Sequence, residues 1–102
     1  MTDKSWPFDV SRDTAVVTTS YVTKSRMPVL SASHQYDEEE GVIWQFHCGN
    51  GDYRSSVLQL VRLDEILRLD PGLAALANLP LGFRATRTAP GTNWITEKEA
   101  SE

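Results

Sequence analysis

The sequence predicts an α+β domain in which an antiparallel sheet of about four to five strands packs against two short helices. Two observations support this fold class. The first half of the chain contains segments rich in β-branched and aromatic residues, several of which alternate with polar residues as half-buried strands do. The second half has leucines at helical spacing on both sides of Asp70-Pro71. We expect residues 1–102 to form one domain, with residues 1–12 as an N-terminal arm and residues 97–102 as a frayed tail.

Three segments before residue 49 are expected to be strands: Thr14–Thr23, Pro28–Tyr36 and Val42–Cys48. The third is the clearest, because its large apolar residues occupy alternate positions and share one face: Val42, Trp44, Phe46 and Cys48. We expect this face to point into the core. The second and third strands should form a hairpin, since a run of carboxylates and a glycine separates them.

The rest of the chain predicts two helices and a last strand. Residues 53–61 show no clear period, and we expect a loop that leads into a helix. The segment Leu63–Leu69 has its apolar residues on one helical face. Pro71 suits the first position of a second helix, with Asp70 as its N-cap. A final strand at Phe83–Thr88 and a short edge element at Asn93–Ile95 complete the expected fold.

Composition narrows the range of functions. The formal net charge is -4 and the pI about 5.1, which argues against nucleic-acid binding as the main activity. One cysteine cannot build an internal disulfide framework. No apolar run approaches the roughly 20 residues that a membrane helix needs, and the first residues do not resemble a signal peptide. We therefore expect a cytoplasmic protein that engages neither nucleic acid nor membrane.

Candidates for catalysis or metal binding are few: His34, His47 and Cys48. A two-histidine metal site would require His34 to approach His47 across the hairpin, with a carboxylate from residues 37–40. A cysteine nucleophile with a histidine base would need a similar approach. We favour two ordinary sheet histidines and a buried, inert thiol. The expectation is no catalytic residue, no metal and no cofactor.

Two surface segments are the candidate interface. The first is the acidic hairpin tip, whose carboxylates repel one another and require water; it either contacts a basic partner or is simply a solvated turn. The second is the turn after the third strand, where glycines and polar residues interrupt the sheet. The residues concerned are Asp37, Glu38, Glu39, Glu40, Asn50, Asp52, Tyr53 and Arg54.

A set of motifs between Tyr21 and Arg87 resembles a bacterial family of small domains of unknown function, also known as immunity protein thirty-three among polymorphic-toxin neutralisers. The matching residues are Val22-Thr23, Trp44-x-Phe46-x-x-Gly49, Leu63, Asp70-Pro71, Leu76 and Gly82 with Arg87 five positions later. The resemblance implies a non-catalytic domain that binds a protein partner such as a cognate toxin. The alternative is a small-ligand or regulatory domain with a pocket near Tyr36, Trp44 and Arg87.

Overall fold

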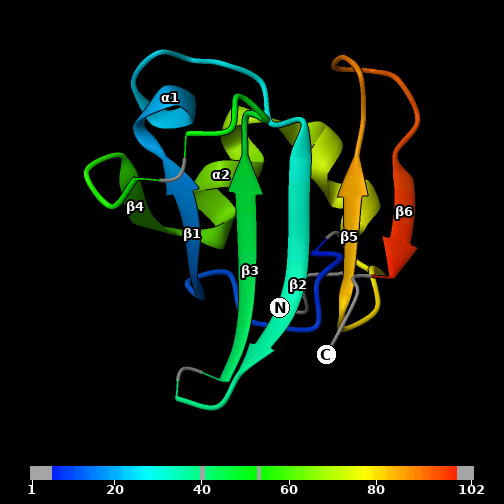
Figure 1. Ribbon diagram of the computed structural model, residues 1–102. Helices are drawn as coiled ribbons and strands as arrows, with labels where there is room; N and C mark the ends of the chain where they lie inside the picture. Colours follow the sequence, from blue (N-terminus) through cyan, green and yellow to red (C-terminus); the bar gives the residue numbers. More distant parts are fainter. Residues whose placement is uncertain (1–5, 40, 53, 99–102) are drawn as a thin grey trace.

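The computed structural model describes residues 6–39, 41–52 and 54–98. Its strands form one sheet in the order β4-β1-β3-β2-β5-β6, and the helices α2 and η1 lie behind this sheet in Figure 1. The 3₁₀ helix is labelled η1. The elements are β1 (Ala15–Thr19), α1 (Ser20–Thr23), β2 (Ser31–Asp37), β3 (Gly41–His47), β4 (Leu58–Arg62), α2 (Leu63–Leu69), η1 (Pro71–Leu76), β5 (Phe83–Thr86) and β6 (Ile95–Lys98).

The α+β class is confirmed, but the sheet is mixed and has six strands. The expected hairpin forms, with His34 opposite Trp44 in the β2–β3 pair. Strand β3 then inserts between β1 and β2, so that it runs parallel to β1, with Val17 opposite Gln45. The expectation of a purely antiparallel sheet of four to five strands was therefore wrong, because β1 pairs with β3 and not with β2, the next strand in sequence.

The strand expected at Thr14–Thr23 is shorter than predicted and ends at Thr19. The next residues form the single helical turn α1, a third helix that the sequence did not indicate. The backbone N–H of Ser20 donates to the Val57 carbonyl at 2.8 Å, just before the first residue of β4. The helical turn then buries Val22, which is 3% exposed.

The segment expected to be a loop and helix entry instead forms the edge strand β4, antiparallel to β1. Its apolar residues occupy both faces, so the segment lacks the alternation of apolar and polar residues that usually indicates a strand. Leu58 and Leu60 point to the uncovered side of the sheet, where Leu60 is 72% exposed. Val61 points to the other side and packs against the core.

The core lies between the sheet and the two helices α2 and η1. On the sheet side, Trp44 and Phe46 are buried as predicted, and burial of a side chain such as Phe46 contributes about 2 kcal/mol. Val42 was expected on this core face but is 49% exposed, because it is close to the solvent-exposed hairpin tip. The helices contribute mainly Leu63, Ile66, Leu73 and Leu76.

The N-terminal arm closes one end of the core. Phe8 is 6% exposed and meets Trp44 edge to face, with ring centroids 5.2 Å apart. The Trp6 indole N–H donates to the Val10 carbonyl at 2.7 Å, which folds the arm back on itself.

The two expected helices meet at the Asp70-Pro71 bend, and the second of them is a 3₁₀ helix. Asp70 occupies the N-cap position of η1, but its side chain makes no capping hydrogen bond. Its carboxylate instead accepts from Arg87 Nη2 at 2.6 Å and from the Val29 backbone N–H at 3.3 Å. The predicted capping role of this side chain was wrong, because a buried guanidinium competes for the carboxylate.

The last two strands extend the sheet beyond β2. Strand β5 ends at Thr86, two residues before the predicted end of the last strand. The edge element expected at Asn93–Ile95 lies slightly later, as β6, and takes in Glu97 and Lys98 from the segment expected to fray. No helix among the described residues is long and apolar enough to cross a membrane.

Candidate interaction surface

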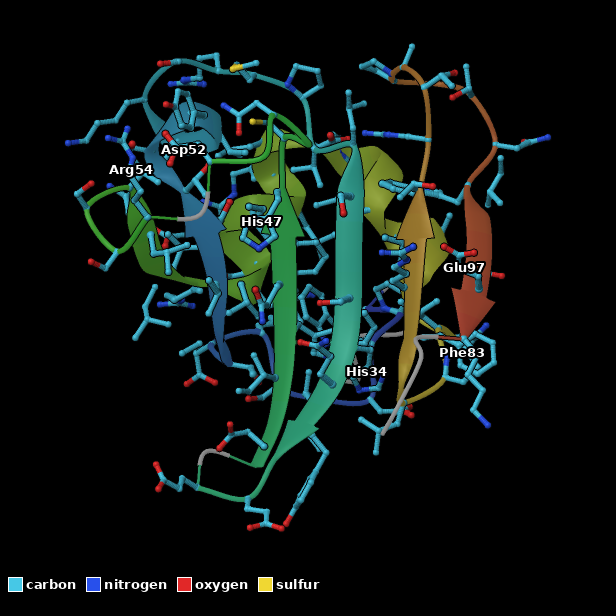
Figure 2. The ribbon with its side chains drawn as sticks, viewed as in Figure 1. His34, His47, Asp52, Arg54, Phe83 and Glu97 are labelled. Atoms are coloured by element: carbon cyan, nitrogen blue, oxygen red, sulfur yellow. The ribbon has the colours of Figure 1, made fainter. Side chains whose placement is uncertain are left out.

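The two predicted interface segments lie at opposite ends of β3 (Figure 2). The acidic tip precedes this strand and the 50–54 turn follows it. Seven residues of extended chain separate the two segments by about 20 Å. Glu40 and Tyr53, both predicted interface residues, lie outside the described part of the chain. The segments therefore do not form one continuous contact surface.

The acidic tip is a solvent-facing turn. Asp37, Glu38 and Glu39 are all exposed. The Glu39 backbone N–H donates to Asp37 Oδ1 at 2.7 Å, an Asx turn that fixes the chain reversal. The hairpin of β2 and β3 extends past the helices at the lower end of the sheet in Figure 1.

The 50–54 turn is held by a network centred on Asp52. Arg54 donates to both Asp52 carboxylate oxygens, at 2.9 and 2.8 Å, and the Tyr21 hydroxyl of α1 donates to Oδ2 at 2.6 Å. The hydrogen bonds from Arg54 and then from Tyr21 hold the pKa of Asp52 well below its usual range. The Asn50 side chain accepts from the Asp52 backbone N–H at 3.0 Å. These charges are already paired with one another, so the turn is better suited to fixing the loop than to attracting a charged partner.

The two histidines point to opposite faces of the sheet. His34 lies on the helix side, where it stacks on Trp44 with ring centroids 4.0 Å apart and donates through Nδ1 to the Leu79 carbonyl at 2.7 Å. His47 lies on the uncovered side, with its Nε2 2.9 Å from Gln45 Oε1. The suggestion that the two rings could meet across the hairpin was wrong, because the register pairs His34 with Trp44 and His47 with Ser31.

The described part of the chain does not bring together the side chains that a metal site or a cysteine nucleophile with a histidine base would need. No group of three or more His, Cys, Asp or Glu side chains there could hold a metal ion. Cys48 is 4% exposed and continues the core face of β3. It does not share a face with His47, the residue before it, because neighbouring side chains on an extended segment point to opposite sides.

The residues proposed for a small-ligand pocket do not come together. Trp44 is buried in the core at 4% exposure, whereas Tyr36 is 63% exposed near the acidic tip. Arg87 lies beside the opposite end of β2, where its backbone N–H donates to the Leu30 carbonyl at 3.1 Å. These three residues therefore do not line one cavity.

The uncovered face of the sheet was not identified from the sequence. We call it the open face; it is the side of the sheet opposite to α2 and η1. On this face its three central strands, β1, β3 and β2, carry one charged residue, Asp37 at the tip end of β2, although 24% of the whole chain is charged. The other residues are Ala15, Val17, Thr19, Ile43, Gln45, His47, Ser31, Ser33 and Gln35, of which Thr19 and His47 are buried.

Charged residues flank this centre. On β5 and β6, Arg84 Nε donates to Glu97 Oε2 at 2.8 Å, and both side chains are about half exposed. On β4, Arg62 forms an ion pair with Asp64 at 2.8 Å. The large apolar side chains at the two edges of the sheet are Leu60 and Ile95, which are 72% and 66% exposed.

The centre of the open face is a shallow polar depression of about 290 Å³. Gln45 Nε2 donates to Gln35 Oε1 at 3.1 Å across the β2–β3 pair, which orders the two amides. Burial lowers the pKa of His47, so its ring is neutral at neutral pH. The lining is completed by Ser31, Ala32, Ser33 and Arg84.

The alternation of Ser31, Ser33 and Gln35 with buried residues was a usable signal for a polar strand face. It did not show that similar faces of β1 and β3 would lie beside it, because that depends on strand pairing.

Comparison with protein-family models, with curated proteins and with solved structures found no match.

Proposed function

We propose that this chain is a non-catalytic protein-binding domain that acts in the cytoplasm and resembles a toxin-neutralising immunity protein. The observation that carries the proposal is the open face of β1, β3 and β2, which is neutral between Asp37 at the tip and Arg84 on β5 and is bordered by ion pairs and exposed apolar residues. Protein interfaces have the same arrangement, with charged residues depleted at the core and polar groups at the rim.

The physical argument concerns the cost of binding. A charged side chain at the centre of an interface would have to lose its water, whereas neutral hydroxyls and amides exchange water for partner hydrogen bonds at little net cost. The backbone beneath Ser33 and Gln45 is fixed by sheet hydrogen bonds on both sides. Little conformational entropy would therefore be lost when a partner binds.

The acidic tip has a separate role in this proposal. Its exposed carboxylates lie at one end of the sheet, so they attract a basic partner during diffusion and orient it. Such a contribution raises the association rate and is weakened by salt. It fits the resemblance to immunity proteins, whose partners are toxins.

The test begins with purification of the tagged chain from its native cell to isolate a stoichiometric protein partner. Affinity is then measured for the wild type and for Ser33→Glu, which puts a carboxylate in the centre of the open face. Arg84 lies directly opposite Ser33 on β5, so the fold accommodates this charge. We expect affinity to fall at least about tenfold, or about 1.4 kcal/mol.

The matched control is Ala74→Glu, which adds the same charge on an exposed position of η1. This variant should keep its affinity within about twofold of the wild type. Absence of a stoichiometric partner, or equal losses in the two variants, would refute the proposal. Reversal of charge at Glu38 and Glu39 should slow association and flatten its salt dependence; unchanged kinetics would make the tip a solvated turn only.

A further inference from the structure

A groove runs between the edge strand β4 and the helix α2, on the side of the sheet opposite to the open face. It has a volume of about 520 Å³ and is lined by Thr23, Arg26, Gln59, Val61, Glu65, Ile66, Arg68 and Leu69. A second hollow of about 360 Å³ shares Arg26 and Leu69 with it and continues past Met27 and Pro28. The two hollows together form an elongated site, which fits an extended chain better than a compact molecule.

The groove carries a surplus of positive charge, because its lining has two arginines, Arg26 and Arg68, and one carboxylate, Glu65. Neither Arg26 nor Arg68 forms an ion pair within the described part of the chain. Of the acidic residues at the two hollows, Glu65 accepts from the Arg62 backbone N–H at 3.3 Å, and Asp70 is paired with Arg87. The nearby Asp64 already binds Arg62 through both carboxylate oxygens, at 3.1 and 2.8 Å. Two guanidinium groups beside apolar side chains are therefore available to an anionic ligand.

The edge of β4 supplies backbone groups to the same site. The Val57 carbonyl accepts from the Ser20 N–H, and the Leu63 N–H donates to the Thr14 carbonyl. The backbone groups of Gln59 and Val61 therefore also face β1, and those of the residues between them face outward. The outward N–H of Leu58 is used by Ser55, and that of Arg62 is used by Glu65. The N–H and C=O of Leu60 have no hydrogen-bond partner among the described residues.

We propose that this groove binds an extended acidic segment of a partner protein, which adds to the edge of β4 at Leu60 and places its carboxylates against Arg26 and Arg68. An added strand directs alternate side chains to one side, here into the groove between β4 and α2. Apolar residues of the segment then cover Val61 and Leu69. The site is separate from the open face and does not depend on the function proposed for that face.

Arg26 offers a variant that separates binding from folding. Its φ of 59° lies in the left-handed region, where glycine is favoured and arginine is strained. Arg26→Gly therefore removes the guanidinium while relieving the backbone, and the variant should be as stable as the wild type or more so. A loss of binding in this variant is not explained by unfolding.

The experiment selects binders from a phage-displayed library of random eight-residue peptides, using the intact chain as bait. We expect the selected peptides to alternate Asp or Glu with apolar residues. Fluorescence anisotropy with the best labelled peptide should show at least a tenfold loss of affinity for the double variant Arg26→Gly/Arg68→Gln. Methylation of the central backbone nitrogen of the peptide should weaken binding similarly, because it removes the donor to Leu60.

The control is Lys98→Gln, which removes one positive charge at the opposite edge of the sheet, on β6. It should bind within about twofold of the wild type, as should Ser33→Glu on the open face. Selection of basic or uncharged peptides, failure to enrich any peptide, or full binding by the double arginine variant would overturn the proposal. None of these results would refute the open-face proposal, because that proposal is tested with variants on a different surface.

Discussion

At the scale of single residues, Arg87 is the most constrained charged side chain in the described structure. Its side chain is 2% exposed, and it donates to Asp70 at 2.6 Å and to the Val29 carbonyl at 3.0 Å. Its guanidinium lies over the Trp94 ring, 4.4 Å from the centroid. Arg87 thereby joins the end of β5, the start of β2 and the bend between α2 and η1.

The same arginine explains a glycine inside a helix. A Cβ at position 72 would lie 2.8 Å from Arg87 Nη1, closer than such atoms approach. Because Arg87 is fixed by Asp70, it cannot easily move aside. Gly72 is thus required by a tertiary contact, and not by the local conformation of η1.

We predict that Arg87→Met destabilises the fold by about 3 kcal/mol, because it leaves the Asp70 carboxylate, 15% exposed, without its cation. Equilibrium unfolding in urea measures this change. Arg84→Met is the matched control, since the Arg84–Glu97 pair is about half exposed and should cost less than about 1 kcal/mol. Similar losses in the two variants would show that the Arg87 pair contributes no more than a surface pair.

At the scale of elements, the sequence did not predict the contacts of the N-terminal arm or the strand β4. The sequence predicted an arm at residues 1–12 but not its contacts, and the structure shows that Phe8 reaches Trp44. Strand β4 was missed because leucines occupy the face that the sheet leaves uncovered. A strand with apolar residues on both faces has no polar alternation to detect.

The arm should contribute strongly to stability. We predict that Phe8→Ala lowers the free energy of unfolding by about 3 kcal/mol, because it removes a buried ring that Trp44 contacts edge to face. Thermal unfolding followed by tryptophan fluorescence measures the loss. Tyr36→Ala, at a ring that is 63% exposed, should change stability by less than about 0.5 kcal/mol. If both variants unfold like the wild type, the arm is not part of the folded unit.

At the scale of the whole molecule, charge is distributed unevenly. Acidic residues gather at the β2–β3 tip, Arg26 and Arg68 line the groove between β4 and α2, and the middle of the open face consists of neutral side chains on β1, β3 and β2. This separation places the two proposed contacts on different sides of one sheet. Protonation of His47 would add a positive charge to the depression that Arg84 also lines.

The stability of the fold should therefore fall in mild acid. Burial lowers the pKa of His47 from its usual 6.5, so below about pH 6.5 the unfolded chain takes up a proton that the folded chain resists. We predict that wild-type stability decreases relative to His47→Gln as pH falls from about 7.5 to about 5.5, by at most about 1.4 kcal/mol per pH unit. Urea unfolding across this range measures the difference; parallel curves for the two proteins would contradict the prediction.

Local sequence patterns were enough to predict the α+β class, the β2–β3 hairpin, the core face of β3 around Trp44 and Phe46, and the bend at Asp70-Pro71. These features follow from side-chain periodicity and local backbone preferences, which act between neighbours in the chain. Tertiary structure decided the insertion of β3 beside β1, the pairing of β4, the side chain that engages Asp70 and the alignment of polar residues on the open face. Periodicity shows which residues of a strand share a face, but the strand that lies alongside depends on contacts between distant segments that must all fit one core.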